Sequence, residues 1–253
     1  MSEVPQFQVI GLVGLPEIQH GDDLPSFIIE AARAQGTGVR DGDVLVVTQK
    51  VVSKAEGCLV NLTEVQPSDR ARQLGRATGR DPRLMEVILR ESRRIVRQEG
   101  QVIITETKHG FVCANAGVDA SNVGGGDLVA LLPEDPDHSA ESIRQAVQEM
   151  AGVAVAVIIS DTFGRPWREG HTNVAVGVAG MSPVRDYVGQ RDPFGYELRV
   201  STMAVADELA GAAEPVMGKL SRVPVAIVRG LAFEPGAGTA QELIRPPERD
   251  LFR

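Results

Sequence analysis

Short apolar runs alternate along the chain with segments of helical spacing, which predicts mixed secondary structure. The runs typical of buried strands lie at 7–13, 43–48, 153–159 and 223–228. Further strands are expected at 101–105, 110–114, 128–132, 174–180 and 197–202. Apolar residues at helical spacing indicate helices over 22–34, 67–79, 82–99, 139–150 and 203–217. The pattern therefore predicts an α+β fold with several buried strands.

The strand predicted at 153–159 is followed at once by Ser160, Asp161 and Thr162, which we expect at its end. Gly and Pro residues within 164–170 then predict a long loop, which also carries two arginines. A carboxylate and a hydroxyl at the end of a buried strand, with arginines after them, are typical of a metal–phosphate site. A turn cap at Asp161 with solvated arginines explains the same residues equally well.

Three polar loops are expected directly after strands, at 14–18, 49–54 and 117–126. The third contains Asp119, Asn122 and three consecutive glycines. Glycines allow backbone N–H groups to converge on an anion, and a carboxylate can hold a hard cation. Plain turns account for the glycines at least as often. Neither GxxxxGK[ST] nor GxGxxG follows a strand, so the two common phosphate-binding loops are not indicated.

Asp119 and Asp161 both follow apolar strands, and their carboxylates form our main hypothesis for a site. Two carboxylates from separate strand ends can share one or two divalent cations, with Thr162 adding a neutral oxygen. Lys54 and the arginines at 165 and 168 would neutralise phosphate charge. That the two loops meet in space is an assumption at this stage.

Composition narrows the class of protein. Of 253 residues 43% are hydrophobic, which suffices for one large domain or two small subdomains. The chain has 26 basic and 34 acidic residues, a balance that argues against a general nucleic-acid binder. No apolar stretch is long enough to span a bilayer, and no signal peptide is recognisable. The two cysteines lack metal-ligand spacing and favour a reducing compartment, so we expect a cytoplasmic protein.

Other chemistry is weakly indicated. The four histidines are scattered singly, none has a partner four residues away, and no GxSxG motif is present. His171 alone lies in the central loop. Trp167, the only tryptophan, is either a packing anchor or a stacking face for a flat ring.

Several motifs, taken together and in order, resemble the coenzyme F420-0:L-glutamate ligases, the CofE-like γ-glutamyl ligase family. They are GLPEI, TQKVVSKAEG, AGVDASNV, SDTFGRPWREG, RDPFGYEL, VADELAGAAEPVMGKL and VPVAIVRG. The resemblance extends from about Gly11 to Gly230, nearly the whole chain.

This resemblance implies a GTP-dependent ligase in coenzyme F420 biosynthesis. Such an enzyme adds L-glutamate to the lactyl carboxylate of the deazaflavin precursor F420-0 and extends a γ-linked glutamate tail through an acyl phosphate. The resemblance also implies Mg²⁺ or Mn²⁺, two per active site, and stimulation by K⁺. The implied fold is a homodimer of two intertwined α/β subdomains with mixed sheets. One ligase domain would cover 1–253, with a mobile tail over 235–253 and no flavin-reductase-like domain.

The resemblance also assigns roles to individual residues. Asp119 and Asp161 would be catalytic through one metal, and Thr162 would hold a second. Residues expected to bind GTP are Leu15, Pro16, Glu17, Ile18, Gln49, Lys54 and Asn122, with Gly218 and Lys219 closing over the nucleotide.

One position departs from the family pattern, because many relatives have Ser where this chain has Gln49. A backbone contact to GTP would tolerate that change, whereas a side-chain contact would not. Two alternative functions stay open. One is an amide ligase with a different acid acceptor, and the other is a nucleotide-binding regulator without turnover.

Overall fold

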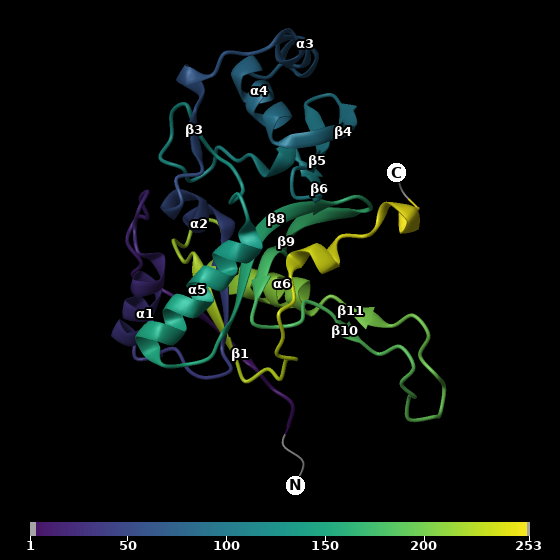
Figure 1. Ribbon diagram of the computed structural model, residues 1–253. Coiled ribbons are helices and arrows are strands. Elements are labelled where there is room, and N and C mark those ends of the chain that lie inside the picture. The colour runs from purple at the N-terminus through teal and green to yellow at the C-terminus, as the bar shows by residue number, and fades with distance from the viewer. Residues whose placement is uncertain (1–3, 252–253) are drawn as a thin grey trace.

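The computed structural model describes residues 4–251 and is organised around a five-stranded sheet with the order β1-β12-β2-β8-β9 (Figure 1). Its strands are β1 (Gln8–Leu12), β12 (Val225–Arg229), β2 (Val44–Thr48), β8 (Ala156–Arg165) and β9 (Arg168–Ala179). β12 is antiparallel to both β1 and β2, while β2 and β8 are parallel. Strands β1, β2 and β8 therefore share one direction, and their carboxyl ends lie at the same end of the sheet.

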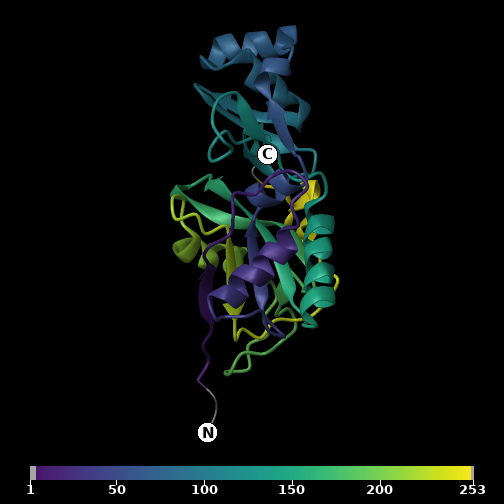
Figure 2. The same ribbon diagram turned by 90° about the vertical axis from the view of Figure 1, so that its left-hand side faces the viewer.

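Helices cover both faces of this sheet (Figures 1 and 2). One face carries α1 (Leu24–Ala34) and α5 (Pro136–Ala151), and the other carries α6 (Val205–Met217). Asp23 and Asp135 cap α1 and α5, each accepting a backbone N–H of the first turn. The short helix α2 (Gln49–Ala55) begins directly after β2. The central strands carry unbroken apolar runs at 44–47, 156–159 and 225–228, which are buried between these layers as in other two-sided sheets.

A smaller subdomain lies at the end of the molecule opposite the N-terminus (Figure 2). It contains α3 (Asp69–Thr78), α4 (Pro82–Arg90) and the antiparallel sheet of β4 (Ser92–Glu99), β5 (Val102–Thr107) and β6 (Val112–Ala114). The ladder of β3 (Leu59–Asn61) and β7 (Leu128–Ala130) leads into it and out of it. Its own apolar cluster includes Met85, Ile88 and Ile103.

An extended arm leaves the main body between β9 and α6 (Figure 1). The ladder of β10 (Arg185–Asp186) with β11 (Thr202–Met203) closes its base. Phe194, near its far end, is 96% exposed. After β12 the chain forms short 3₁₀ turns at Ala240–Leu243 and Pro247–Arg249. The last two residues of the predicted tail, 252–253, lie outside the described residues, as do 1–3.

The expected α+β class with mixed sheets is confirmed, and so are the strands of the main sheet and the long helices. The hairpin of strands expected at 101–105 and 110–114 is confirmed as β5 and β6. Within residues 4–251, no helix is both long and apolar enough to cross a membrane.

Four predictions about local structure were wrong. The helix expected over 82–99 ends at Arg90, and 92–99 forms β4. The loop expected at 49–54 is helix α2. The strand expected to end before Ser160 continues to Arg165, and the loop expected after it is the turn of a hairpin with β9. The strand expected at 197–202 is reduced to Thr202–Met203, because residues 197–201 belong to the exposed arm.

Candidate active site

The direction of the strands brings the predicted segments to one end of the main sheet. Residues 13–18 follow β1, α2 follows β2, and Asp161 comes one residue after Ser160, which pairs with Thr48 at the last position of β2. The carboxyl ends of parallel strands are the usual place for ligand sites in such sheets. On β8, residues 156–160 are buried and residues from 164 onward are exposed. Asp161 lies where the buried part of the strand ends.

Asp119 is held in its loop by a cation and by a serine. The Lys50 ammonium donates to Asp119 Oδ2 at 2.7 Å and to Ser121 Oγ at 2.8 Å. The Ser121 backbone N–H donates to Asp119 Oδ1 at 2.7 Å, and its hydroxyl donates to Oδ2 at 2.9 Å. Burial opposes ionisation of Asp119, but these donors and the charge of Lys50 outweigh it and lower the pKa of the carboxyl.

Asp161 has the opposite electrostatic character. Burial raises its pKa to about 6, and the nearby charge of Asp119 pushes in the same direction. The Thr162 backbone N–H and the charges of Lys50 and Lys219 oppose this rise without cancelling it. The two carboxylates therefore lie within electrostatic range of each other, around a lysine that pairs directly with only one of them.

Thr162 connects β8 to the segment after α6. The Lys219 ammonium donates to Thr162 Oγ1 at 2.5 Å, and that hydroxyl donates to Asn173 Oδ1 of β9 at 2.8 Å. Gly218 ends α6 with a φ of 58°, a left-handed value that favours glycine, and so turns the chain toward Thr162. The structure thus brings together Thr162 and Lys219, which the sequence assigned to metal and to nucleotide.

The segment 14–18 and helix α2 also meet, because the buried Lys54 ammonium pairs with Glu17. Gln49 is 1% exposed, and its Oε1 accepts from Ser53, but its Nε2 has no partner among the described residues. Ser160 is also 1% exposed, and its hydroxyl has no partner within residues 4–251. Buried polar atoms are nearly always hydrogen-bonded, so two orphans at the same end of the sheet suggest a place for a ligand or water.

The remaining predicted residues have less defined surroundings. Leu15 packs partly against the main core, Ile18 is buried, and Pro16 is exposed. Asn122 is exposed in the glycine-rich loop with a φ of 56°. Within residues 4–251 none of these side chains forms a hydrogen bond or an ion pair with the two carboxylates, so their assignment to the nucleotide stays a prediction.

Lys50 is the residue that sequence reasoning missed. It lies in the segment 49–54, which the sequence predicts to be a loop, and a loop gives no reason to place it beside Asp119. In helix α2, residues 50 and 54 are four positions apart and so lie on one face. A helix predicted at this point would have put Lys50 on the same face as Lys54. Cys113 of β6 also lies in range of the Asp161 charge, and its thiol, whose pKa burial raises to about 12, stays neutral.

The donor set fits a hard divalent cation. Asp119, Asp161 and Thr162 offer only oxygen atoms, which Mg²⁺ and Mn²⁺ prefer. Within residues 4–251 there is no group of three or more His, Cys, Asp or Glu placed to hold a metal. Mg²⁺ usually takes few protein ligands and leaves positions for phosphate oxygens and water.

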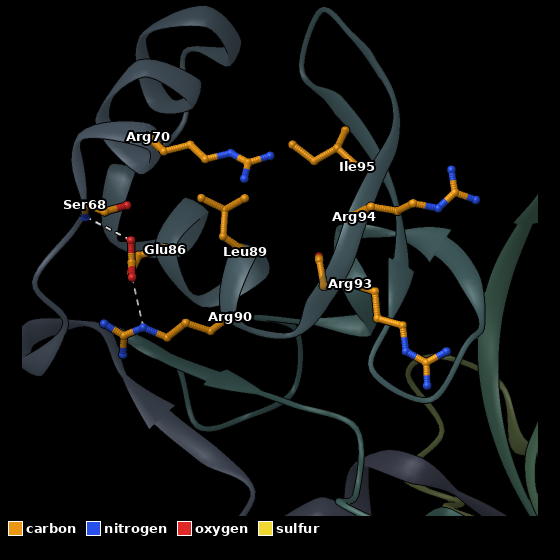
Figure 3. Close-up of a pocket in the computed structure, with 9 residues that line it drawn as sticks. Ser68, Arg70, Glu86, Leu89, Arg90, Arg93, Arg94 and Ile95 are labelled. Atoms are coloured by element: carbon orange, nitrogen blue, oxygen red, sulfur yellow. Dashed lines mark hydrogen bonds and ion pairs between the residues drawn. The ribbon is translucent and has the colours of Figure 1, made fainter.

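A separate hollow of about 270 Å³ lies in the smaller subdomain, between α3, α4 and β4 (Figure 3). Its lining includes Arg70, Arg90, Arg93 and Arg94, and Glu86 pairs with Arg90 at 3.0 Å. None of the predicted site residues lines it. It is therefore distinct from the carboxylate site.

These features define a mixed α/β protein with an oxygen-lined, lysine-flanked site at the end of its main sheet. The family model described as F420-0:Gamma-glutamyl ligase matches residues 13–230, and the chain belongs to this family.

Similar proteins named coenzyme F420:L-glutamate ligase occur in several archaea. That of Methanothermobacter thermautotrophicus is 49% identical over 248 residues, which cover 97% of this chain and 98% of the relative. That of Methanopyrus kandleri is 48% identical over 242 residues, 94% of each chain. That of Methanocaldococcus jannaschii is 45% identical over 254 residues, 100% of this chain and 99% of the relative.

Proposed function

We propose that this protein is a GTP-dependent ligase that joins L-glutamate to the deazaflavin precursor F420-0 and extends a γ-linked glutamate tail. Family membership over nearly the whole chain supports the reaction class. The observation that carries the chemistry is the pair Asp119 and Asp161 within electrostatic range, flanked by lysines. A regulator without turnover would have no need for such a pair.

The reaction requires activation of a carboxylate. Its oxygen attacks the γ-phosphorus of GTP, the bond to the β-phosphate oxygen breaks, and GDP leaves with an acyl phosphate formed. The amine of glutamate then attacks the acyl carbon, phosphate departs, and the amine loses its proton. Phosphoryl transfer depends mainly on positioning and charge neutralisation, which suits a site of carboxylates and lysines.

We infer that Asp119 and Asp161 hold one Mg²⁺ or Mn²⁺ and that Thr162 contributes to a second. When bound, the cations neutralise charge on the transferring phosphoryl group. The contact of Lys219 with Thr162 supports a role for this ammonium toward a phosphate oxygen. Stimulation by K⁺ is part of the proposal, and exchange of K⁺ for Na⁺ in the assay tests it.

The nucleotide would lie along 15–18, Gln49, Lys54 and Asn122, with Gly218 and Lys219 over it. Support comes from the contact of Lys54 with Glu17 and from the Nε2 of Gln49, which has no hydrogen-bond partner in the described part of the chain. That free donor favours a side-chain contact at Gln49 over a backbone one.

We further propose a homodimer. The arm at 187–201 exposes apolar side chains, Phe194 and Val200 among them, of the kind that a second copy would cover. Light scattering of the purified protein measures the state directly, and a monomer at assay concentration would refute it.

The decisive experiment is incubation of the protein with GTP, Mg²⁺, L-glutamate and F420-0, followed by mass spectrometry of the acceptor. We expect increments of glutamyl residues and release of GDP. An unmodified F420-0 alongside another glutamylated acid would favour the different-acceptor alternative. No product from any acid, with tight GTP binding, would favour the regulator.

Guanine preference is tested by comparing specificity constants for GTP and ATP. A site matched to the guanine edge leaves buried polar groups unpaired when adenine enters, at about 1–3 kcal/mol each. Two such groups give roughly a hundredfold preference for GTP. Equal constants would refute both the preference and the role given to Leu15–Ile18.

A further inference from the structure

The hairpin of β8 and β9 begins in the core and ends at an exposed turn (Figure 1), and Asp161 lies on β8 between the two. Residues 156–160 of β8 are buried, Asp161 to Phe163 are partly buried, and 164–171 are exposed. The same pair of strands therefore carries the metal ligand and a surface feature beyond it. The tip contains Trp167, which is 71% exposed.

The tip is a well-defined structure. Arg165 pairs with Arg168 in the ladder, so the turn itself consists of Pro166 and Trp167. The Arg165 guanidinium donates to the Glu169 carbonyl at 2.6 Å and to the Gly170 carbonyl at 3.4 Å. These bonds fasten one side of the turn to the other and so define the backbone that carries Trp167.

Charge at the tip favours an anionic ligand. Residues 164–171 contain two arginines and one glutamate, in a chain with a net charge of −8. The Arg168 guanidinium makes no hydrogen bond or ion pair within residues 4–251. A single exposed apolar residue is ordinary by itself. An indole beside an unpaired guanidinium, on the strand that carries Asp161, is a combination suited to a flat, negatively charged molecule.

The order of strands places this tip away from the nucleotide segment. Residues 15–18 follow β1 at one edge of the sheet, and β9 forms the other edge, with Asp161 between them. Phosphoryl transfer needs the attacking and leaving oxygens roughly in line on opposite sides of phosphorus. A donor and an acceptor that approach from the two edges would reach phosphorus from different sides, which is what this geometry requires. Arg165 lies four positions after Asp161 on β8, roughly 13 Å at the usual rise per residue.

We propose that Trp167 stacks on the deazaflavin ring of the acceptor and that Arg168 pairs with its negative charge, while its carboxylate reaches the site beside Asp161. This assignment rests on the proposed function, since it names the acceptor side of the same reaction. The acceptor has the two ends that the hairpin separates, an aromatic ring and a reactive carboxylate. Arg165 is a positioning residue that fixes the turn.

The test uses the single tryptophan as its own probe. Titration of F420-0 into the wild-type protein without GTP should quench indole emission to saturation, and GTP alone should leave emission unchanged. In the glutamylation assay, Trp167→Ala should raise the KM for F420-0 roughly tenfold, the lower range of ring stacking, with the KM for GTP unchanged. Trp167→Phe keeps an aromatic face and should stay near wild type. Arg168→Ala should raise the same KM, whereas Arg72→Ala, an exposed arginine of α3, should not.

The outcomes separate this inference from the proposed function. Product formation with an unchanged acceptor KM in Trp167→Ala, or no quenching in the wild type, overturns the stacking role and leaves the ligase intact. Saturable quenching without any glutamylated product supports the ring site and overturns the ligase. Equal rises in the KM for GTP and for F420-0 in Trp167→Ala would show a general disturbance of the hairpin and also overturn the assignment.

Discussion

Two aspartates of the candidate site lie in opposite environments. Asp161 follows the buried part of β8, whereas Asp119 lies in a polar, glycine-rich loop. Burial at this point of the strand removes solvent from Asp161, and one backbone donor does not compensate, so the pKa of Asp161 rises to about 6. The loop gives Asp119 an ammonium, a hydroxyl and a backbone N–H, so its pKa falls. Without a cation, the two therefore differ in how easily each holds a negative charge.

This difference suggests a division of roles. A carboxylate that is costly to ionise gains most when a cation arrives, because the cation replaces the solvation that burial removed. A carboxylate already paired with lysine must exchange that partner for the metal. Asp161 is thus the ligand on which cation binding should depend most, and Asp119 the one whose contribution Lys50 controls.

The largest expected effect follows from Asp161→Asn. The amide keeps the shape but removes the charge, so we expect turnover to fall by roughly a thousandfold or more, as when other groups that stabilise transition-state charge are removed. Glutamyl transfer at saturating Mg²⁺ is the measurement, with circular dichroism to verify the fold. Wild-type rates would remove Asp161 from the site and end the comparison.

The next effect is a dependence of stability on pH in the metal-free protein. Because the folded pKa of Asp161 lies above its ordinary value of 3.8, the folded state binds more protons between those values. The free energy of unfolding should therefore be highest at low pH with respect to this group and fall as pH rises through about 6. The full difference is about 3 kcal/mol.

Urea unfolding at pH 4 and pH 8 in EDTA measures the contribution of Asp161 to the free energy of unfolding. The reference is Asp161→Asn, in which residue 161 cannot titrate. The variant should gain on the wild type as pH rises, and Mg²⁺ should reduce that gain. Asp119 has the opposite sign, since its lowered pKa stabilises the fold above the ordinary value and that contribution is lost as pH falls. A constant difference between wild type and Asp161→Asn across the range would contradict the strand environment assigned to Asp161.

Strands could be predicted from the sequence where burial makes their apolar pattern clear. Strands enclosed on both faces, such as β12, read as unbroken β-branched runs and were found. β4 was missed because register shifts at Ser92/Arg94 and Ile95/Arg97 break the alternation that a strand should show. The hairpin tip was mistaken for a long loop, since Pro166 occupies its turn and Gly164 adjoins its register shift. Both wrong predictions therefore concern positions where a strand or a hairpin departs from regular pairing.

The site was predictable as a set of candidates but not as an arrangement. Asp119 and Asp161 could be nominated because each follows an apolar run. The contrast between their pKa values could not be predicted. It depends on Lys50, which is 69 positions from Asp119 in the sequence, and on the burial of Asp161 in β8. The contact of Lys219 with Thr162 likewise depends on the direction in which α6 ends.

A smaller effect is expected from Lys50→Met. The change removes the partner of Asp119 and leaves two carboxylates in range of each other, which should cost about 2 kcal/mol without metal. Mg²⁺ should recover more stability in the variant than in the wild type, because no ammonium competes for the carboxylate. Thermal unfolding with and without MgCl₂ measures both. Lys108→Met removes a comparable pair with Glu91, 2.9 Å apart, away from the site and serves as the control.

If Lys50→Met gained no more from Mg²⁺ than Lys108→Met does, the loop carboxylate would not be a cation ligand. The different pKa values of Asp161 and Asp119 would then have no bearing on cation binding.

The smallest effect should come from Ser121→Ala, which tests how much of the loop environment is the hydroxyl alone. The variant loses the bond from Ser121 Oγ to Asp119 and the bond that Lys50 donates to that hydroxyl, but keeps the backbone donor and the ion pair. We expect a loss of about 0.5–1 kcal/mol. The acid limb of the stability curve should also move slightly to higher pH, because the pKa of Asp119 would rise toward its ordinary value. Ser142→Ala, which removes a hydroxyl bonded only to the His138 carbonyl of its own helix, should leave that limb in place. A shift as large in Ser121→Ala as in Lys50→Met would mean that the hydroxyl, rather than the ammonium, keeps Asp119 ionised.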